Sequence, residues 1–105
     1  MTTKSRKQQI EEMLADDPND SFLRYGLAME YAGTGDTSGA LSQFRILIAA
    51  TPDYVAAYHQ AGQLLIRTGN AAEARQLLTS GIVEAGRQGN GHAAEEMQGL
   101  LDGIG

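Results

Sequence analysis

Residues 27–44 read LAMEYAGTGDTSGALSQF, and residues 61–78 read AGQLLIRTGNAAEARQLL. The two stretches align at an offset of 34 positions, since Gly35 corresponds to Gly69 (69 − 35 = 34). Residues of like character recur at this offset throughout: Ala28 pairs with Gly62, Tyr31 with Leu65, Asp36 with Asn70, Ala40 with Ala74 and Phe44 with Leu78. A period of this length is typical of repeat architectures.

Each stretch has the pattern of two helices joined by a tight turn. Gly35 and Gly69 follow an apolar-periodic arm, at the point where a helix end favours a residue with positive φ. The Asp36 or Asn70 that comes next can cap the following helix. The sequence therefore predicts two successive helical hairpins.

With these residues at this period, the chain resembles a small bacterial-type tetratricopeptide repeat protein with two full repeats and flanking helices. Counted from Ser21 and from Val55, the repeats match the family pattern at Leu27, Ala28, Tyr31, Gly35, Ala40, Phe44 and Pro52, and at Tyr58, Ala61, Gly62, Leu65, Gly69, Ala74 and Leu78. The resemblance implies an all-α fold. We expect a short right-handed solenoid of helical hairpins with about five antiparallel helices.

Four residues depart from the family pattern, and one of them, Leu47, replaces a small residue of the first repeat. Arg24 stands where an aromatic residue is usual. Gly81 lies in the interior of a predicted helix, where glycine costs roughly 0.5–1 kcal/mol relative to alanine, so we expect it to mark a close contact between helices. Gly86 takes the place of the second repeat's proline, and the repeat pattern ends there.

The repeats and their flanks divide the chain. We expect one domain, residues 1–105, with repeats at 21–54 and 55–88. Residues 4–15 are predicted to form an N-terminal packing helix, whose Ile10, Met13 and Leu14 fall at core positions of a truncated repeat. Residues 90–102 are predicted to form a C-terminal capping helix, because solenoid ends need a seal.

Composition excludes several classes of function. The chain has 8 basic and 13 acidic residues, a net charge of −5, which opposes binding to nucleic acid or to anionic membranes. It has no cysteine, so thiolate metal sites and disulfides are absent. The sequence shows neither a signal peptide nor an apolar run long enough to span a bilayer, so we expect a cytoplasmic protein.

The resemblance also implies where a partner binds. In the family, one face of the first helix of each repeat lines a concave groove. On that face the first repeat has Phe22, Tyr25 and Met29, an apolar wall, and the second has His59, Gln60, Gln63 and Arg67, a polar wall. We expect this groove to bind a peptide or helix of another protein.

Self-association is the alternative. A homodimer would bury the same apolar groove, or the C-terminal helix with its tail QGLLDGIG. The sequence does not separate these two interpretations. It does argue against the clamp with which some family members hold a partner's C-terminal carboxylate, since the clamp positions carry no cation here: they are Phe22, Tyr25, Gly26 and Met29, then Ala56, His59, Gln60 and Gln63.

The residues give no support for catalysis or for a cofactor. His92 and Glu96 are four positions apart on the last predicted helix, but two ligands are too few for a closed metal site. His59 has no serine, cysteine or acid at a fixed spacing that would build a nucleophilic centre. We therefore expect a non-enzymatic protein without a metal.

Overall fold

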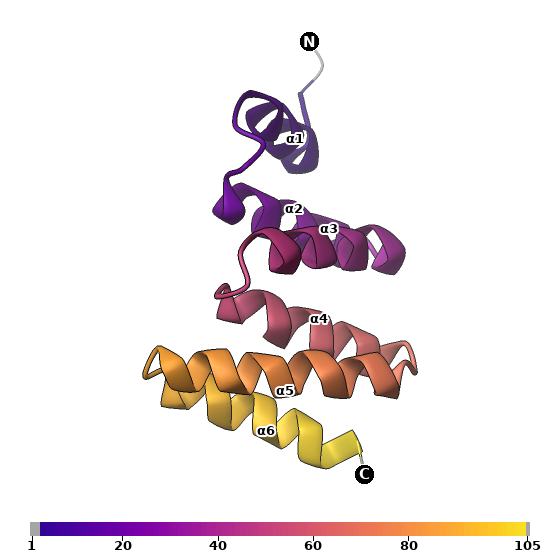
Figure 1. Ribbon diagram of the computed structural model, residues 1–105. Coiled ribbons are helices and arrows are strands. Elements are labelled where there is room, and N and C mark those ends of the chain that lie inside the picture. Colours follow the sequence, from indigo (N-terminus) through magenta and orange to yellow (C-terminus); the bar gives the residue numbers. More distant parts are fainter. Residues whose placement is uncertain (1–2, 105) are drawn as a thin grey trace. The chain divides into compact units, whose positions relative to one another are not determined.

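The computed structural model describes residues 3–104, and within that range every element is a helix (Figure 1). The helices are α1 (Arg6–Asp16), α2 (Ser21–Gly33), α3 (Thr37–Ala50), α4 (Val55–Arg67), α5 (Ala71–Arg87) and α6 (Gly91–Ile104). The described part of the chain thus has six helices rather than about five. The physical reason is that each repeat is a hairpin of two helices, and a flanking helix at either side brings the number to six.

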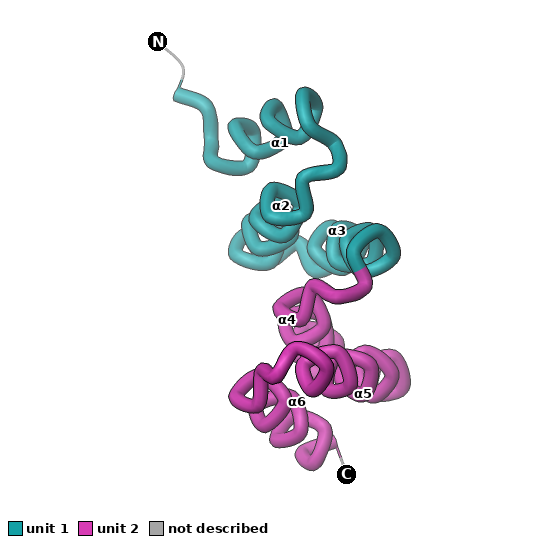
Figure 2. The backbone as a smooth tube through the Cα atoms, turned by 60° about the vertical axis from the view of Figure 1, so that its left-hand side comes forward, with its two compact units in different colours: residues 1–51 teal, residues 52–105 magenta. Residues whose placement is uncertain are grey.

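The chain forms two compact units, residues 1–51 and residues 52–105 (Figure 2). In the first unit, α2 packs against both α1 and α3. In the second unit, α4, α5 and α6 all pack against one another. Each unit is therefore a three-helix assembly with its own core.

The first unit's core lies partly between α1 and α2. Ile10 and Leu14 of α1 are buried together with Leu27 of α2, and Leu23 and Tyr31 pack against them. The residues are spaced three or four apart on each helix, which places them on one face. Burying apolar side chains of this size stabilises the contact by about 1.5–3 kcal/mol each.

In the second unit, two glycines allow the helices to approach one another closely. A Cβ added to Gly62 of α4 would lie 2.6 Å from Leu78 Cδ2 of α5. A Cβ added to Gly81 of α5 would lie 2.6 Å from Tyr58 Cβ and equally close to Met97 Sδ. The expectation that Gly81 marks a close helix contact is confirmed, since it admits α4 and α6 on the same side of α5.

The turns repeat in geometry as well as in sequence. Gly35 and Gly69 have φ of 81° and 83°, so both adopt the left-handed conformation expected of them. After each glycine, Asp36 accepts a bond from Gly39 N (2.9 Å) and Asn70 from Glu73 N (3.4 Å). These side chains cap α3 and α5 as the sequence predicts.

Helix α5 is longer than its counterpart α3 because it has no proline to stop it. Its 17 residues exceed the 14 of α3. Gly86 stands in α5 at the position that the 34-residue register gives to Pro52. The helix then ends in a further turn at Gly89, with φ of 69°, and Gln88 Nε2 donates to Asp53 O at 2.7 Å.

Candidate functional site

On α2, the three residues predicted to form an apolar wall differ in exposure. Phe22 is 75% exposed and Met29 is 38% exposed. Tyr25 is half-buried, and its ring packs on Phe44 of α3 with the centroids 6.1 Å apart and the planes inclined at 54°. Phe22 and Met29 are therefore free to meet a partner, whereas Tyr25 belongs largely to the packing of the first unit.

On α4, the four predicted polar residues share one helix and differ in exposure. His59 and Gln60 are half-buried, while Gln63 and Arg67 are exposed. The spacing of four between His59, Gln63 and Arg67 puts them on one face. Tyr58, next to His59 in sequence, is buried and 5% exposed. The α4 face can therefore offer amide and guanidinium hydrogen bonds.

Arg24 is held in place by polar contacts. Its Nη1 donates to Gln43 Oε1 at 2.7 Å, and its Nη2 donates to Pro18 O at 3.1 Å. The guanidinium thus connects α2 with α3 and with the turn before α2. At this position the family pattern has an aromatic residue, and here the hydrogen bonds of Arg24 take the place of aromatic packing.

Sequence reasoning missed the surface of α1. Met13 was expected to pack on the first repeat, together with Ile10 and Leu14, but it is 47% exposed while the other two are buried. The reason is that helical periodicity places a side chain on an apolar face without showing which neighbour covers it. Met13 lines a cavity of about 220 Å3 between α1 and α2, together with Phe22.

Two basic side chains, those of Arg6 and Lys7, lie at the beginning of α1 and contact α2. Lys7 Nζ lies 4.5 Å from the centroid of the Tyr31 ring, a cation–π contact. Arg6 Nε lies 3.6 Å from Glu30 Oε1, and the Arg6 side chain is 77% exposed. Each contact connects α1 to α2 while leaving positive charge at the surface.

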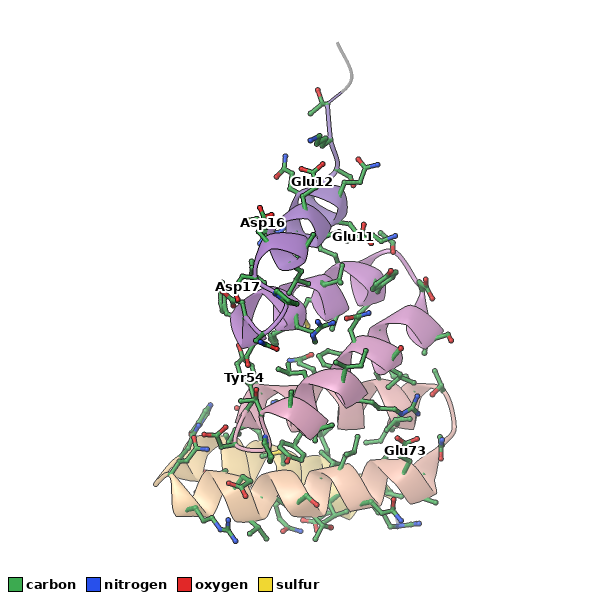
Figure 3. The ribbon with its side chains drawn as sticks, turned by 45° about the horizontal axis from the view of Figure 1, so that its top comes forward. Glu11, Glu12, Asp16, Asp17, Tyr54 and Glu73 are labelled. Carbon is green, nitrogen blue, oxygen red and sulfur yellow. The ribbon has the colours of Figure 1, made fainter. Side chains whose placement is uncertain are left out.

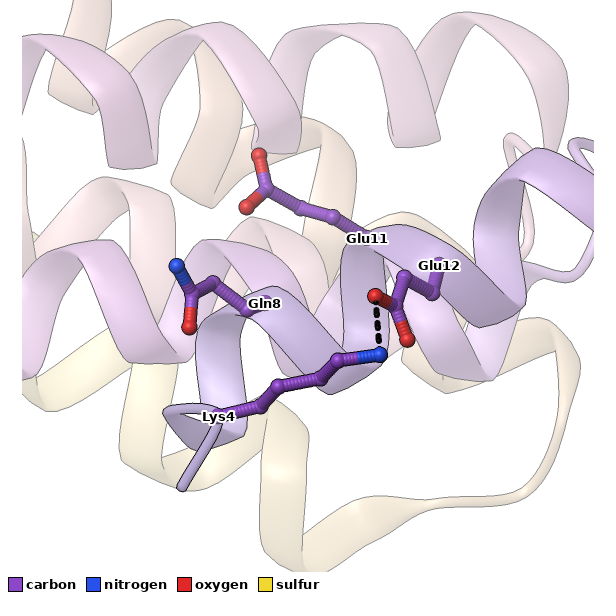
Figure 4. Close-up of a pocket in the computed structure, with 4 residues that line it drawn as sticks. All are labelled: Lys4, Gln8, Glu11 and Glu12. Carbon is purple, nitrogen blue, oxygen red and sulfur yellow. Dashed lines mark ion pairs between the residues drawn. The ribbon is translucent and has the colours of Figure 1, made fainter. Parts of the chain in front are cut away.

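A second, open cavity lies on the outer side of α1 (Figure 4). Gln8, Glu11, Lys4 and Glu12 line it, and Lys4 Nζ pairs with Glu12 Oε1 at 2.6 Å. All four side chains are exposed, so water screens the ion pair and it adds little stability. Figure 3 shows further carboxylates, those of Asp16 and Asp17, at the other end of α1. The surface of α1 around this cavity is therefore polar.

Tyr58 of α4 has a shifted pKa. The pKa of Tyr58 is raised above its ordinary value of 10.0, first by burial and then by the negative charges of Glu84 and Asp53. Its hydroxyl donates to Pro52 O at 2.6 Å. The shift keeps the phenol protonated as a hydrogen-bond donor, which is a structural role.

Catalytic or metal-binding clusters do not emerge from the described residues. His92 Nε2 lies 3.1 Å from Glu96 Oε1 on the exposed surface of α6. Within residues 3–104, no three side chains of the His, Cys, Asp or Glu type come together as a metal site. No helix in that range is both long and apolar enough to cross a membrane.

Comparison with known proteins gives consistent matches. A family model described as Tetratricopeptide repeat matches residues 31–96. A TPR repeat-containing protein of Pseudomonas aeruginosa is 31% identical over 92 residues, which cover 88% of each chain.

Solved structures agree with the sequence matches. A protein of Bordetella parapertussis has a TM-score of 0.83 at 28% identity, over 97% of this chain and 89% of that one. A tetratricopeptide repeat domain protein of Salinibacter ruber has a TM-score of 0.78 at 32% identity, over 83% and 88%. The TPR2B domain of yeast Sti1, in complex with pHsp70, has a TM-score of 0.86 at 21% identity, over 93% and 78%, and shows the fold alone.

Proposed function

The chain belongs to the tetratricopeptide repeat family, and we propose that it is a non-enzymatic interaction module that binds a peptide or helix of another protein. We propose two contact surfaces, α2 in the first unit and α4 in the second, each considered by itself. The observation that supports this most is the exposure of Phe22 and Met29 on one helix, 75% and 38%. Large apolar side chains held at the surface in a row favour burial by a partner.

The proposed recognition is apolar and amide-based. Phe22 and Met29 supply apolar contact, and a thioether adapts to partners of different shape. On α4, Gln63 and Arg67 are exposed and supply hydrogen bonds. The Sti1 domain is in complex with pHsp70. For this chain we propose a different partner chemistry, since Phe22, Tyr25 and Met29 offer no cation for a terminal carboxylate.

A matched pair of variants tests the proposal by affinity capture from the native cell extract. Met29→Asp places a charge on the proposed surface of α2, and Ile46→Asp places the same charge on α3. The two side chains are similarly exposed in the native chain, 38% and 45%. We expect Ile46→Asp to retain the partner of the wild type and Met29→Asp to lose it. Equal capture by both variants overturns the proposed surface.

Self-association remains the second candidate. A homodimer through the C-terminal helix would need apolar side chains of α6 at the surface. Met97 is fully buried, and Leu100, Leu101 and Ile104 are half-buried. We therefore favour a foreign partner. Sedimentation of the wild type tests self-association, since a monomer excludes a homodimer. If a dimer is found, dissociation by Leu101→Asp would assign it to α6 and dissociation by Met29→Asp to the apolar groove. The expected cytoplasmic location stays a prediction.

A further inference from the structure

We propose that the cleft between α1 and α2 is the docking site for an amphipathic helix of a partner protein, with acidic residues in the last turn of that helix. The inference rests on the proposed function and names the partner's chemistry. The cleft holds the cavity of about 220 Å3 beside Met13 and Phe22. Ile10 and Leu23 also line it, and Gly26 leaves room there because it has no side chain.

The second unit shows what such a cleft accommodates. There, α5 and α6 pack together and α4 packs against both. At twice the repeat offset, α1 corresponds to α5 and α2 to α6, so that Met13 corresponds to Gly81 (81 − 13 = 68) and Ile10 to Leu78. In residues 3–51 of the first unit, the helices are α1, α2 and α3, and α3 packs on α2. The position that α4 takes against α5 and α6 has no counterpart among these described residues.

The contacts of α4 fall on the residues that correspond to the cleft. Gly81 lies against Tyr58 of α4, and Leu78 lies against Gly62 of α4. Both α5 residues are buried, and Leu78 is 0% exposed. Met13, the counterpart of Gly81, is 47% exposed. A helix in the cleft would cover Met13 in the way that α4 covers Gly81.

Charge indicates which end of the partner helix is acidic. In the second unit the last turn of α4 has Arg67 and the first turn of α5 has Glu73. In the first unit the charge at the corresponding end of α1 is opposite, because Arg6 lines the cleft there. Its side chain is 77% exposed, although its Nε lies 3.6 Å from Glu30 Oε1. A helix that runs as α4 does would bring its last turn toward Arg6, where a carboxylate is favoured by the guanidinium and by the N-terminal dipole of α1.

A second copy of the chain fits the cleft poorly. Helix α6 carries Asp102 near its end, but its apolar side is already used, since Met97 is 0% exposed against Gly81. Its exposed side chains are polar, among them Glu95, Glu96 and Gln98. Docking α6 into another copy would require the second unit to open. A foreign helix meets no such cost.

The probe is a synthetic amphipathic peptide, titrated into the isotope-labelled chain and followed by NMR. Its leucines recur at i, i+3, i+4 and i+7, and its last turn carries two glutamates. A matched peptide carries two lysines instead, and circular dichroism verifies that both are equally helical. We expect the glutamate peptide to shift the amides of Ile10, Met13, Leu23 and Gly26. The lysine peptide should bind about tenfold more weakly.

Variants make the result specific. Met13→Glu should weaken binding of the glutamate peptide about tenfold or more, whereas Ile46→Glu on α3 should leave its affinity unchanged. Arg6→Glu should reverse the preference between the two peptides. The proposal is overturned if the peptides bind equally, if Met13→Glu has no effect, or if neither peptide gives a saturable shift. Capture of a native partner that depends on Met29 and not on Met13 would overturn it too, while leaving the proposed function standing.

Discussion

Arg24 and Tyr58, which share one position of the 34-residue register, each donate a hydrogen bond to the carbonyl of the proline six residues before them. Arg24 Nη2 lies 3.1 Å from Pro18 O, and Tyr58 Oη lies 2.6 Å from Pro52 O. Side chains of different chemistry thus make the same connection in the two repeats. The connection attaches the first helix of each hairpin to the turn that precedes it.

The first prediction concerns the Tyr58 connection. Tyr58→Phe keeps the ring and removes the donor to the part-buried Pro52 carbonyl. We expect the free energy of unfolding to fall by about 1 kcal/mol, because the part-buried hydrogen bond is lost. Urea denaturation measures the change, with Tyr31→Phe as the control, since it preserves the ring beneath Lys7. A loss no larger than the control's would show that the hydroxyl contributes little.

Sequence periodicity accounts for much of the fold. The offset between Gly35 and Gly69 predicts both turns, and both have positive φ. Gly81 predicts a close contact because glycine in a helix interior is unfavourable without one. These positions were predictable because the turns depend on residues near in sequence, and because the cost of a glycine inside a helix indicates a compensating contact.

Periodicity accounts for less of the candidate site. The ring contact between Tyr25 and Phe44 depends on where two helices come together, and one helical wheel does not show it. The exposure of Met13 depends on which helices are present beside α1. The repeat register could have indicated this exposure. It pairs Met13 with Gly81 two repeats later, and Gly81 is covered by α4 whereas Met13 is not.

The second prediction concerns Gly81 and Gly86, which lie in the same helix. Gly81→Ala places a methyl group 2.6 Å from Tyr58 Cβ, an atom fixed to the backbone of α4. We expect destabilisation of about 1–3 kcal/mol from overpacking. Gly86→Ala has open space around the new methyl group and should stabilise by up to about 1 kcal/mol. Thermal unfolding of both variants tests the opposite signs, and a common sign would contradict the packing argument.

The third prediction concerns high pH. Burial raises the pKa of Tyr58 above 10.0, with the charges of Glu84 and Asp53 adding to the shift. The folded chain therefore retains this proton more strongly than the unfolded chain. The resulting stability is fully present below the unfolded pKa, near pH 10, and is lost as the pH rises through the folded pKa.

Urea denaturation above and below pH 10 measures this loss. Tyr58→Phe should reduce the slope of stability against pH in the alkaline range. The tyrosinate absorbance that Tyr58→Phe removes should appear at lower pH in Glu84→Gln than in the wild type. An unchanged alkaline slope in Tyr58→Phe would assign the pH dependence to the other tyrosines.

The fourth prediction separates packing from partner contact on α2. Tyr25 packs on the buried ring of Phe44, whereas Phe22 is 75% exposed. Tyr25→Ala should therefore lower the free energy of unfolding by about 2–4 kcal/mol through lost burial and a lost aromatic pair. Phe22→Ala should change it by less than about 0.5 kcal/mol.

Denaturant unfolding of the free chain and partner capture, measured on the same two variants, complete this test. Phe22→Ala should weaken capture while the chain stays fully folded, since its ring is available to a partner. Tyr25→Ala should lose capture only as far as the chain unfolds, and a partner concentration high enough to refold it should restore binding. If Phe22→Ala retains full capture, the partner does not use the exposed ring, and the contact surface on α2 reduces to Met29 and its neighbours.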